Sequence, residues 1–99
     1  MTGVRFEWDN AKSETNRRKH GVGFEEARTV FDDPLAVIFD DVQHSVGERR
    51  EFLIGHSAGH RLLLVCFTER LGAVRIFSSR PASPQEQRDY EEGSNLQRF

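Results

Sequence analysis

The stretch Arg61–Thr68, RLLLVCFT, decides the fold, because its six consecutive apolar residues are typical of a β-strand buried on both faces. The β-type run before it, residues 50–55, is joined to it by residues 56–60, a polar connection of hairpin length. After it, the chain turns at residues 69–72 into another β-type run. We therefore predict a meander of antiparallel strands with RLLLVCFT at its centre.

Two helices are predicted before this meander. The first spans about residues 11–19, with Asp9 or Asn10 as its cap and Gly21 as the left-handed residue that ends it. Its sequence has almost no apolar face, so the burial of apolar side chains cannot be its main support. The second covers residues 24–31, where apolar residues recur at helical spacing, and Asp32-Asp33-Pro34 ends it.

The remaining elements complete an α+β domain. Short strands are expected over residues 4–8 and 35–39, and residues 40–47 read as an exposed acidic loop. Ser83-Pro84-Gln85-Glu86 is a capping box, which predicts a helix that runs to about Glu92, before Gly93. We expect a small antiparallel meander with the two N-terminal helices on one face, a C-terminal helix, one domain over residues 1–93 and a tail over residues 94–99.

Composition narrows the class of protein. The chain has 99 residues, of which 36% are hydrophobic, enough for a single modest core. It has no apolar run long enough to cross a membrane and no export signal, and its single Cys66 lies in an apolar run, so we expect a cytoplasmic protein with a reduced thiol. The four histidines are spread along the chain, so neither a metal site nor a cofactor is expected.

Charge is distributed unevenly along the chain, although the net charge is only -2. Residues 24–48 hold seven acidic side chains and one arginine, whereas residues 49–80 hold six arginines and two glutamates. This pattern predicts a polarised molecule whose basic face could hold a nucleic acid and whose acidic segment meets something cationic. A scattered arrangement in three dimensions would cancel both effects.

Arg75 and Arg80 flank the end of the β-type run over residues 74–83. Residues five apart on a regular strand point to opposite faces, so we predict a bulge or bend near Ser78-Ser79 that lets the two guanidiniums converge. Arginine binds phosphate well, and the start of the following helix favours an anion unless Glu86 already satisfies it. The alternative is that both arginines are ordinary solvated or ion-paired residues.

Several short blocks, in order over residues 4–93, resemble the BrnT family of bacterial toxins. They are Phe6-Glu7-Trp8-Asp9, Asn16, Lys19-His20-Gly21-Val22, Phe24-Glu25-Glu26-Ala27, Asp32-Asp33-Pro34, Glu48-Arg49-Arg50, Ile54-Gly55, Thr68-Glu69-Arg70, Arg75-Ile76, and Arg80-Pro81-Ala82-Ser83 with Glu86 and Tyr90. The resemblance implies a compact RelE-like ribonuclease, the toxin of a type II pair that a BrnA-type DNA-binding antitoxin neutralises. It also implies that this complex represses its own promoter and contacts DNA only through the antitoxin.

Metal-free RNA cleavage needs a base for the 2′-hydroxyl, cations for the phosphorane and an acid for the leaving oxygen. We expect Arg75 and Arg80 to hold the scissile phosphate, with Arg50 or Arg70 on the RNA backbone. Lys19 and His20 would join them from the polar first helix, and His20 is the natural acid or base, unless it only caps that helix.

Three further residues complete the candidate site. Glu48 is a second catalytic candidate, although as an acid it would need burial, and it could instead orient Arg49 or Arg50. Trp8 and Tyr90 could stack on RNA bases, but each is more often a core or interface residue.

Two other functions compete with an RNA-cleaving enzyme. One is a non-catalytic module that binds the antitoxin, forms a homodimer and acts in transcriptional autorepression. The other is direct DNA binding, which is disfavoured because no helix-turn-helix pair is evident.

Overall fold

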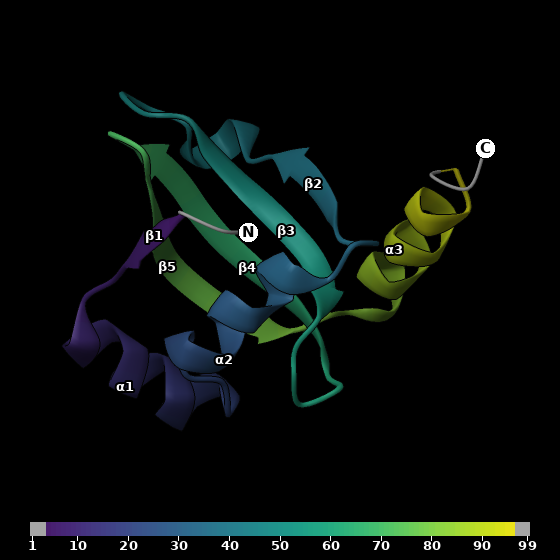
Figure 1. The fold of residues 1–99 in the computed structure, drawn as a ribbon, viewed down its shortest axis with the longest axis horizontal. Coiled ribbons are helices and arrows are strands. Elements are labelled where there is room, and N and C mark those ends of the chain that lie inside the picture. Colours follow the sequence, from purple (N-terminus) through teal and green to yellow (C-terminus); the bar gives the residue numbers. More distant parts are fainter. Residues whose placement is uncertain (1–3, 97–99) are drawn as a thin grey trace.

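The protein, seen in a computed structural model that describes residues 4–96, is built on one five-stranded sheet in the order β1-β5-β4-β3-β2 (Figure 1). The strands are β1 (Arg5–Glu7), β2 (Val37–Asp40), β3 (Arg50–His56), β4 (Leu62–Arg70) and β5 (Ala73–Pro81). The predicted meander is confirmed, because β2, β3, β4 and β5 pair in sequence order and antiparallel. The apolar strand β4 lies at the centre of the sheet, and its residues 63–68 are buried.

The first strand differs from the expected all-antiparallel arrangement. Strand β1 pairs parallel with β5, with Phe6 opposite Val74, so the sheet is mixed. Only three residues of β5 have this partner, and the edge of β5 beyond Arg75 is left to the next element, α1 (Asn10–His20). A helix beside a sheet edge protects backbone groups that would otherwise pair with another chain.

The larger part of the core lies between one face of the sheet and α2 (Phe24–Thr29), which continues into the 3₁₀ turn η1 (Val30–Asp32). Phe24, Ala27 and Val30 are fully buried against sheet residues that include Val65 and Phe67. The expected position on this face therefore holds for α2. It does not hold for α1, whose buried side chains are Ser13 and Asn16.

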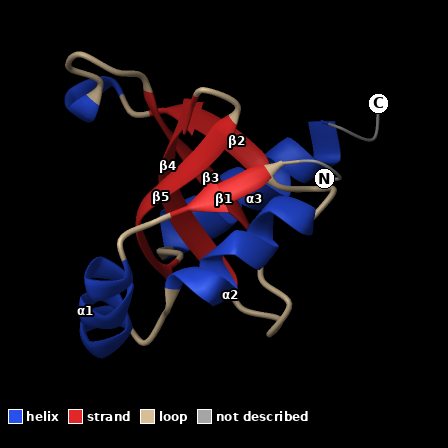
Figure 2. Cartoon of the chain, turned by 60° about the vertical axis from the view of Figure 1, so that its left-hand side comes forward, coloured by secondary structure: helices blue, strands red, loops and turns tan. Residues whose placement is uncertain are grey.

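The C-terminal helix α3 (Pro84–Leu96) covers one end of the opposite face, where Tyr90 packs on Ile54 and Leu64 (Figure 2). The capping box is confirmed, since Ser83 Oγ accepts from the Glu86 amide and Glu86 Oε1 accepts from the Ser83 amide. The helix does not end before Gly93, and it includes residues 94–96 of the predicted tail. The rest of that tail, residues 97–99, lies outside the described residues.

The predicted end signals of α1 are also confirmed. Asp9 accepts hydrogen bonds from the amides of Ala11 and Lys12, and Gly21 ends the helix with φ 74°. In the acidic loop, residues 42–44 form a short 3₁₀ turn, η2 (Val42–His44), and Asp41 is buried rather than exposed. None of the helices within residues 4–96 is both long and apolar enough to cross a bilayer.

Candidate active site on the open face of the sheet

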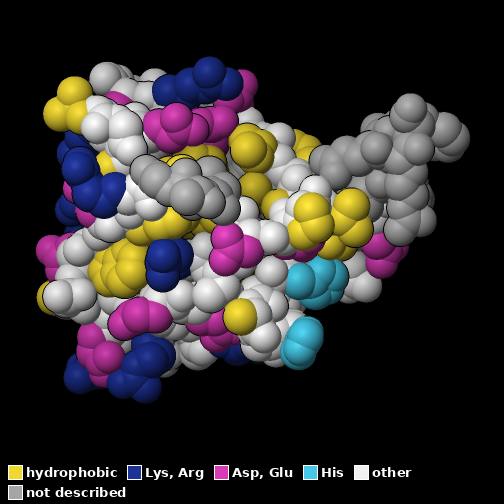
Figure 3. Space-filling model, in the orientation of Figure 1, with side chains coloured by type: hydrophobic (Ala, Val, Ile, Leu, Met, Phe, Trp, Pro, Cys, Tyr) yellow, Lys and Arg dark blue, Asp and Glu magenta, His cyan; other side chains and the backbone are white. Residues whose placement is uncertain are grey.

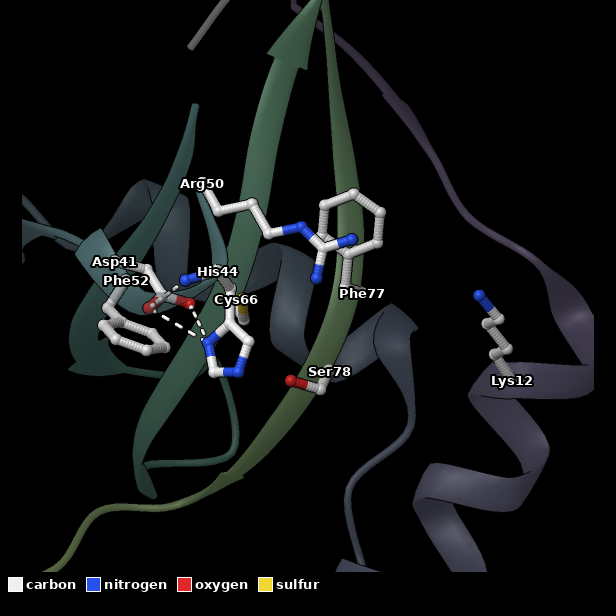
Figure 4. Close-up of a pocket in the computed structure, with 8 residues that line it drawn as sticks. All are labelled: Lys12, Asp41, His44, Arg50, Phe52, Cys66, Phe77 and Ser78. Carbon is white, nitrogen blue, oxygen red and sulfur yellow. Dashed lines mark hydrogen bonds and ion pairs between the residues drawn. The ribbon is translucent and has the colours of Figure 1, made fainter. Parts of the chain in front are cut away.

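The part of the sheet that α3 leaves uncovered carries three adjoining hollows, and Ser78 of β5 lines all of them. The hollow over β3 and β4 has a volume of about 370 Å³ and is lined by Arg50, His44 and Asp41, among others (Figure 4). The neighbouring hollows extend toward α1, at Lys19 and His20, and along β5 to Arg80. Together they form a continuous concave surface with several cations on its walls.

A bulge in β5 creates this surface. Thr68 pairs with Arg75 and Phe67 with Ile76, but Cys66 pairs with Ser78, so Phe77 is the extra residue. The bulge therefore precedes Ser78-Ser79 directly, where the sequence predicted one. Because of it, Arg75, Ser78 and Arg80 share the open face of the sheet.

Arg50 is the best-placed cation for a phosphate. Its guanidinium carbon lies 4.1 Å from the centre of the Phe77 ring, a cation–π contact that holds the group flat over the bulge (Figure 4). Its Nε is buried, makes no hydrogen bond among the described residues, and forms an ion pair with Glu48 Oε1 at 3.7 Å. Because Arg50 lines the hollow and arginine is well shaped to bind phosphate, its guanidinium can take an anion there.

The polar helix α1 is attached to the sheet by Asn16. Its side-chain amide donates to the carbonyl of Ser79 at 2.7 Å and to that of Val22 at 2.8 Å, and its oxygen accepts from the Ser79 amide. These hydrogen bonds explain how a helix with almost no apolar face can be held. They also set Lys19 and His20 beside Ser78.

Arg80 is less free than the sequence suggested. It makes a two-pronged ion pair with Glu86, both contacts at 2.8 Å, and the hydrogen bond from Arg80 holds the pKa of the Glu86 carboxyl below its usual value. Glu86 also caps α3, so the start of this helix is already satisfied by a carboxylate. Arg75 lies 3.8 Å from Glu7 and lines none of the three hollows, so the two arginines share a face without meeting in one pocket.

Glu48 lies between two arginines, 2.7 Å from Arg70 and 3.7 Å from Arg50. The hydrogen bond from Arg70 is the main reason why the pKa of the Glu48 carboxyl is lowered. A carboxylate with a lowered pKa is a poor proton donor, and this position fits the alternative role of orienting Arg50. Arg70 itself is exposed beside it.

The two aromatic candidates are part of the core. The Trp8 ring packs edge-on against Phe24, and Tyr90 is 8% exposed, with its hydroxyl 2.9 Å from Asp33 Oδ2. A buried ring offers no face to an RNA base, so the structure places Tyr90 in the core role that was its alternative. For Trp8, which is partly buried, the core contact is likewise what the structure shows.

The acidic segment has a clear structural role. Glu26 pairs with Arg61, Asp40 with Arg49, and Glu48 with Arg70, so carboxylates of residues 24–48 neutralise arginines of residues 49–80. On the face shown in Figure 3, acidic and basic side chains accordingly lie in adjacent small patches. These ion pairs favour the scattered arrangement that was the alternative to a polarised molecule.

Sequence reasoning assigned no role to Asp41 and His44, which line the same hollow as Arg50. His44 Nδ1 lies 2.9 Å from Asp41 Oδ2. The signal in the sequence was the spacing Asp-x-x-His, which puts the two side chains on one side of a helical turn. The turn η2 was not predicted, because the residues around it are typical of a loop.

A family model described as "Ribonuclease toxin, BrnT, of type II toxin-antitoxin system" matches residues 8–86. The chain belongs to the BrnT family. The crystal structure of the Brucella abortus ribonuclease toxin, BrnT, is similar, with 26% sequence identity and a TM-score of 0.63 over 81% of this chain and 97% of that chain. The comparison with curated proteins found no match. The resemblance seen in the sequence is thus confirmed, and membership of a BrnT toxin family implies an antitoxin partner.

Proposed function

We propose that this BrnT-family chain is an endoribonuclease that cleaves RNA without a metal ion on the open face of its sheet, and so inhibits translation. The observation that carries the proposal is the Arg50 guanidinium, which contacts the Phe77 ring and lines the hollow over β3 and β4. A scissile phosphate in this hollow would accept charge-assisted hydrogen bonds from the guanidinium.

The other basic residues around Arg50 would bind the RNA backbone and transfer protons. Lys12 and Lys19 line the hollows on the α1 side and suit the RNA backbone, while His20 lines the hollows toward Ser78 and Arg80 and can exchange a proton with the leaving oxygen. Arg75 and Arg80 extend the positive surface along the same face, although Glu7 and Glu86 compete for them. In this proposal Arg50 is the main phosphate ligand, the role that was expected of Arg75 and Arg80.

The antitoxin would inhibit the toxin by covering the open face itself. A BrnA-type antitoxin that covers the open face would bring carboxylates to Arg50 and Lys19, because the charges that RNA meets are also those that an acidic peptide segment meets. DNA contacts in the complex would be made by the antitoxin. The fold is expected to be RelE-like, with one compact sheet.

The test compares RNA cleavage by purified wild type and two single variants of neighbouring arginines. Arg50→Ala is expected to lose about 10²-fold or more in kcat/KM, because it removes the donor aimed at the phosphate. Arg49→Ala is the matched control, because Arg49 is exposed and pairs with Asp40 outside the hollow. Arg75→Ala and Arg80→Ala are also expected to lose activity, and their thermal unfolding separates a binding role from a structural one.

Two results would contradict the proposal. Loss of cleavage in EDTA would indicate a metal-dependent nuclease, and equal activity of the Arg50→Ala and Arg49→Ala variants would remove Arg50 from the site. If wild type binds its antitoxin but cuts no RNA, the non-catalytic antitoxin-binding module becomes the better description of the chain.

A further inference from the structure

Asp41 and His44 form a pair in which the carboxylate is buried and the imidazole is not. The Asp41 side chain is 5% exposed and that of His44 is 61% exposed. His44 Nδ1 lies 2.9 Å from Asp41 Oδ2 and 3.1 Å from Oδ1, and the rest of the ring faces the hollow that also holds Arg50 (Figure 4). Asp41 Oδ1 also accepts from the His44 amide at 3.3 Å, so the buried carboxylate caps η2 and holds the ring of the same histidine.

The pair is fixed to Arg50 through the backbone. The Asp41 amide donates to the Arg50 carbonyl at 2.9 Å, and the Arg50 amide donates to Ser45 Oγ at 3.0 Å. Ser45 Oγ in turn donates to the Asp41 carbonyl, which closes the turn around His44. The imidazole and the proposed phosphate ligand are therefore held in one frame, as acid–base catalysis requires.

The hydrogen bond to Asp41 also selects a tautomer. A carboxylate only accepts, so His44 Nδ1 carries the proton, and in the neutral ring Nε2 is left with its lone pair. Nε2 makes no hydrogen bond within residues 4–96. An unoccupied imidazole lone pair beside a phosphate-binding guanidinium is the arrangement of a general base.

We propose that the Asp41–His44 pair is the general base of RNA cleavage, an assignment that rests on the proposed function. His44 Nε2 takes the proton from the ribose 2′-hydroxyl as the 2′-oxygen attacks the phosphorus atom. The bond between phosphorus and the 5′-oxygen breaks, and the leaving 5′-oxygen takes a proton from water or His20. The products are a 2′,3′-cyclic phosphate and a 5′-hydroxyl, so no oxidant or cofactor is needed. Asp41 acts only through His44, as a positioning residue.

The experiment measures cleavage rates of a short RNA from pH 5 to 9 with wild type, His44→Ala, Asp41→Asn and the control His60→Asn. His60 is an exposed histidine in the β3–β4 turn with φ 64°, a conformation that asparagine tolerates. His44→Ala is expected to be about 10²-fold slower near neutral pH. Its rate should rise steadily with pH where wild type levels off, because hydroxide must replace the base.

Asp41→Asn separates positioning from structure. Asparagine keeps the shape of Asp41 but can donate to His44 Nδ1, which moves the ring proton to Nε2 and removes the base. We expect it to be nearly as slow as His44→Ala, with no further loss in the double variant and an unchanged Tm. The other charged or ionisable groups that face His44 are Arg50, Cys66 and Lys12, and Arg50→Ala should lower the rate without changing the shape of the pH profile.

The outcomes distinguish this proposal from the proposed function. If wild type cuts RNA and His44→Ala cuts within about twofold of it, or keeps the level region of the pH profile, the pair is not the base although the chain is a ribonuclease. If Asp41→Asn is as fast as wild type, Asp41 does not set the tautomer. If wild type cuts no RNA, the proposed function fails first.

Discussion

Single residues at the junction of α1 and β5 decide whether the site is assembled. Asn16 is 8% exposed and satisfies two carbonyls and one amide from two other segments. Few side chains other than asparagine can donate twice and accept once from that position. Lys19 and His20 depend on it, because they follow it on the same short helix.

We therefore expect Asn16→Ala to lower the free energy of unfolding by about 2–4 kcal/mol, since it leaves buried backbone groups without partners. Chemical denaturation measures this loss. Thr15→Ala is the control, because Thr15 is exposed on the same helix. A loss below about 0.5 kcal/mol for Asn16→Ala would show that water replaces the amide and that α1 is held in another way.

At the scale of elements, the sequence predicted helices and strands correctly where neighbouring residues alone determine the element. The capping box of α3, the Asp9 cap and Gly21 are of this kind, and so is the apolar run of β4. The parallel pairing of β1 was not predictable in this way, because the partner of a terminal strand depends on residues far along the chain. Gly93 was misread for the same reason.

Gly93 lies inside α3 because the helix passes close to β2 there. A Cβ atom at this position would be 2.6 Å from Val37 Cγ2. We expect Gly93→Ala to destabilise the protein by about 1–3 kcal/mol, although alanine favours a helix by about 1 kcal/mol over glycine. Thermal unfolding is the measurement, with Gln87→Ala at an exposed position of α3 as control.

A double variant tests the cause. If the overlap with Val37 is responsible, Val37→Ala should recover much of the loss in the Gly93→Ala background, which a double-mutant cycle would show as coupling. Independent effects of the two substitutions would mean that α3 can shift away from β2 at little cost.

Across the whole molecule, the acidic and basic segments of the sequence form ion pairs with each other. Sequence could supply the family, the sheet and most of the cations, but not which arginines already have carboxylate partners. Arg80 and Arg61 make close ion pairs with Glu86 and Glu26, whereas Arg50 lies 3.7 Å from its Glu48 partner and lines a hollow. Such choices depend on three-dimensional neighbours, and the Asp41–His44 pair was missed for the same reason.

These pairs predict how stability responds to acid. The pKa of Glu86 is lowered from its ordinary value of 4.5, chiefly by the hydrogen bond from Arg80. A group whose pKa is lower in the folded state stabilises the protein above the ordinary value and loses that contribution as pH falls through the folded value. We therefore expect the free energy of unfolding to fall below pH 4.5, and to fall less steeply in Glu86→Gln.

Urea unfolding at several pH values from 2.5 to 7 measures this difference. Glu92→Gln, at an exposed position of α3, is the control and should follow wild type. Parallel curves for Glu86→Gln and wild type would mean that the Arg80 pair contributes nothing to the acid response.

The bulge at Phe77 determines how the open face responds to a deletion in β5. Side chains along a regular strand alternate, so Arg75 and Arg80 share the open face only because the bulge takes up one residue of the count between them. An alanine scan would leave that count intact and overlook it. Deleting Phe77 would leave Arg75 and Arg80 four residues apart on a regular strand, so both would stay on the open face and only the ring that contacts Arg50 would be lost.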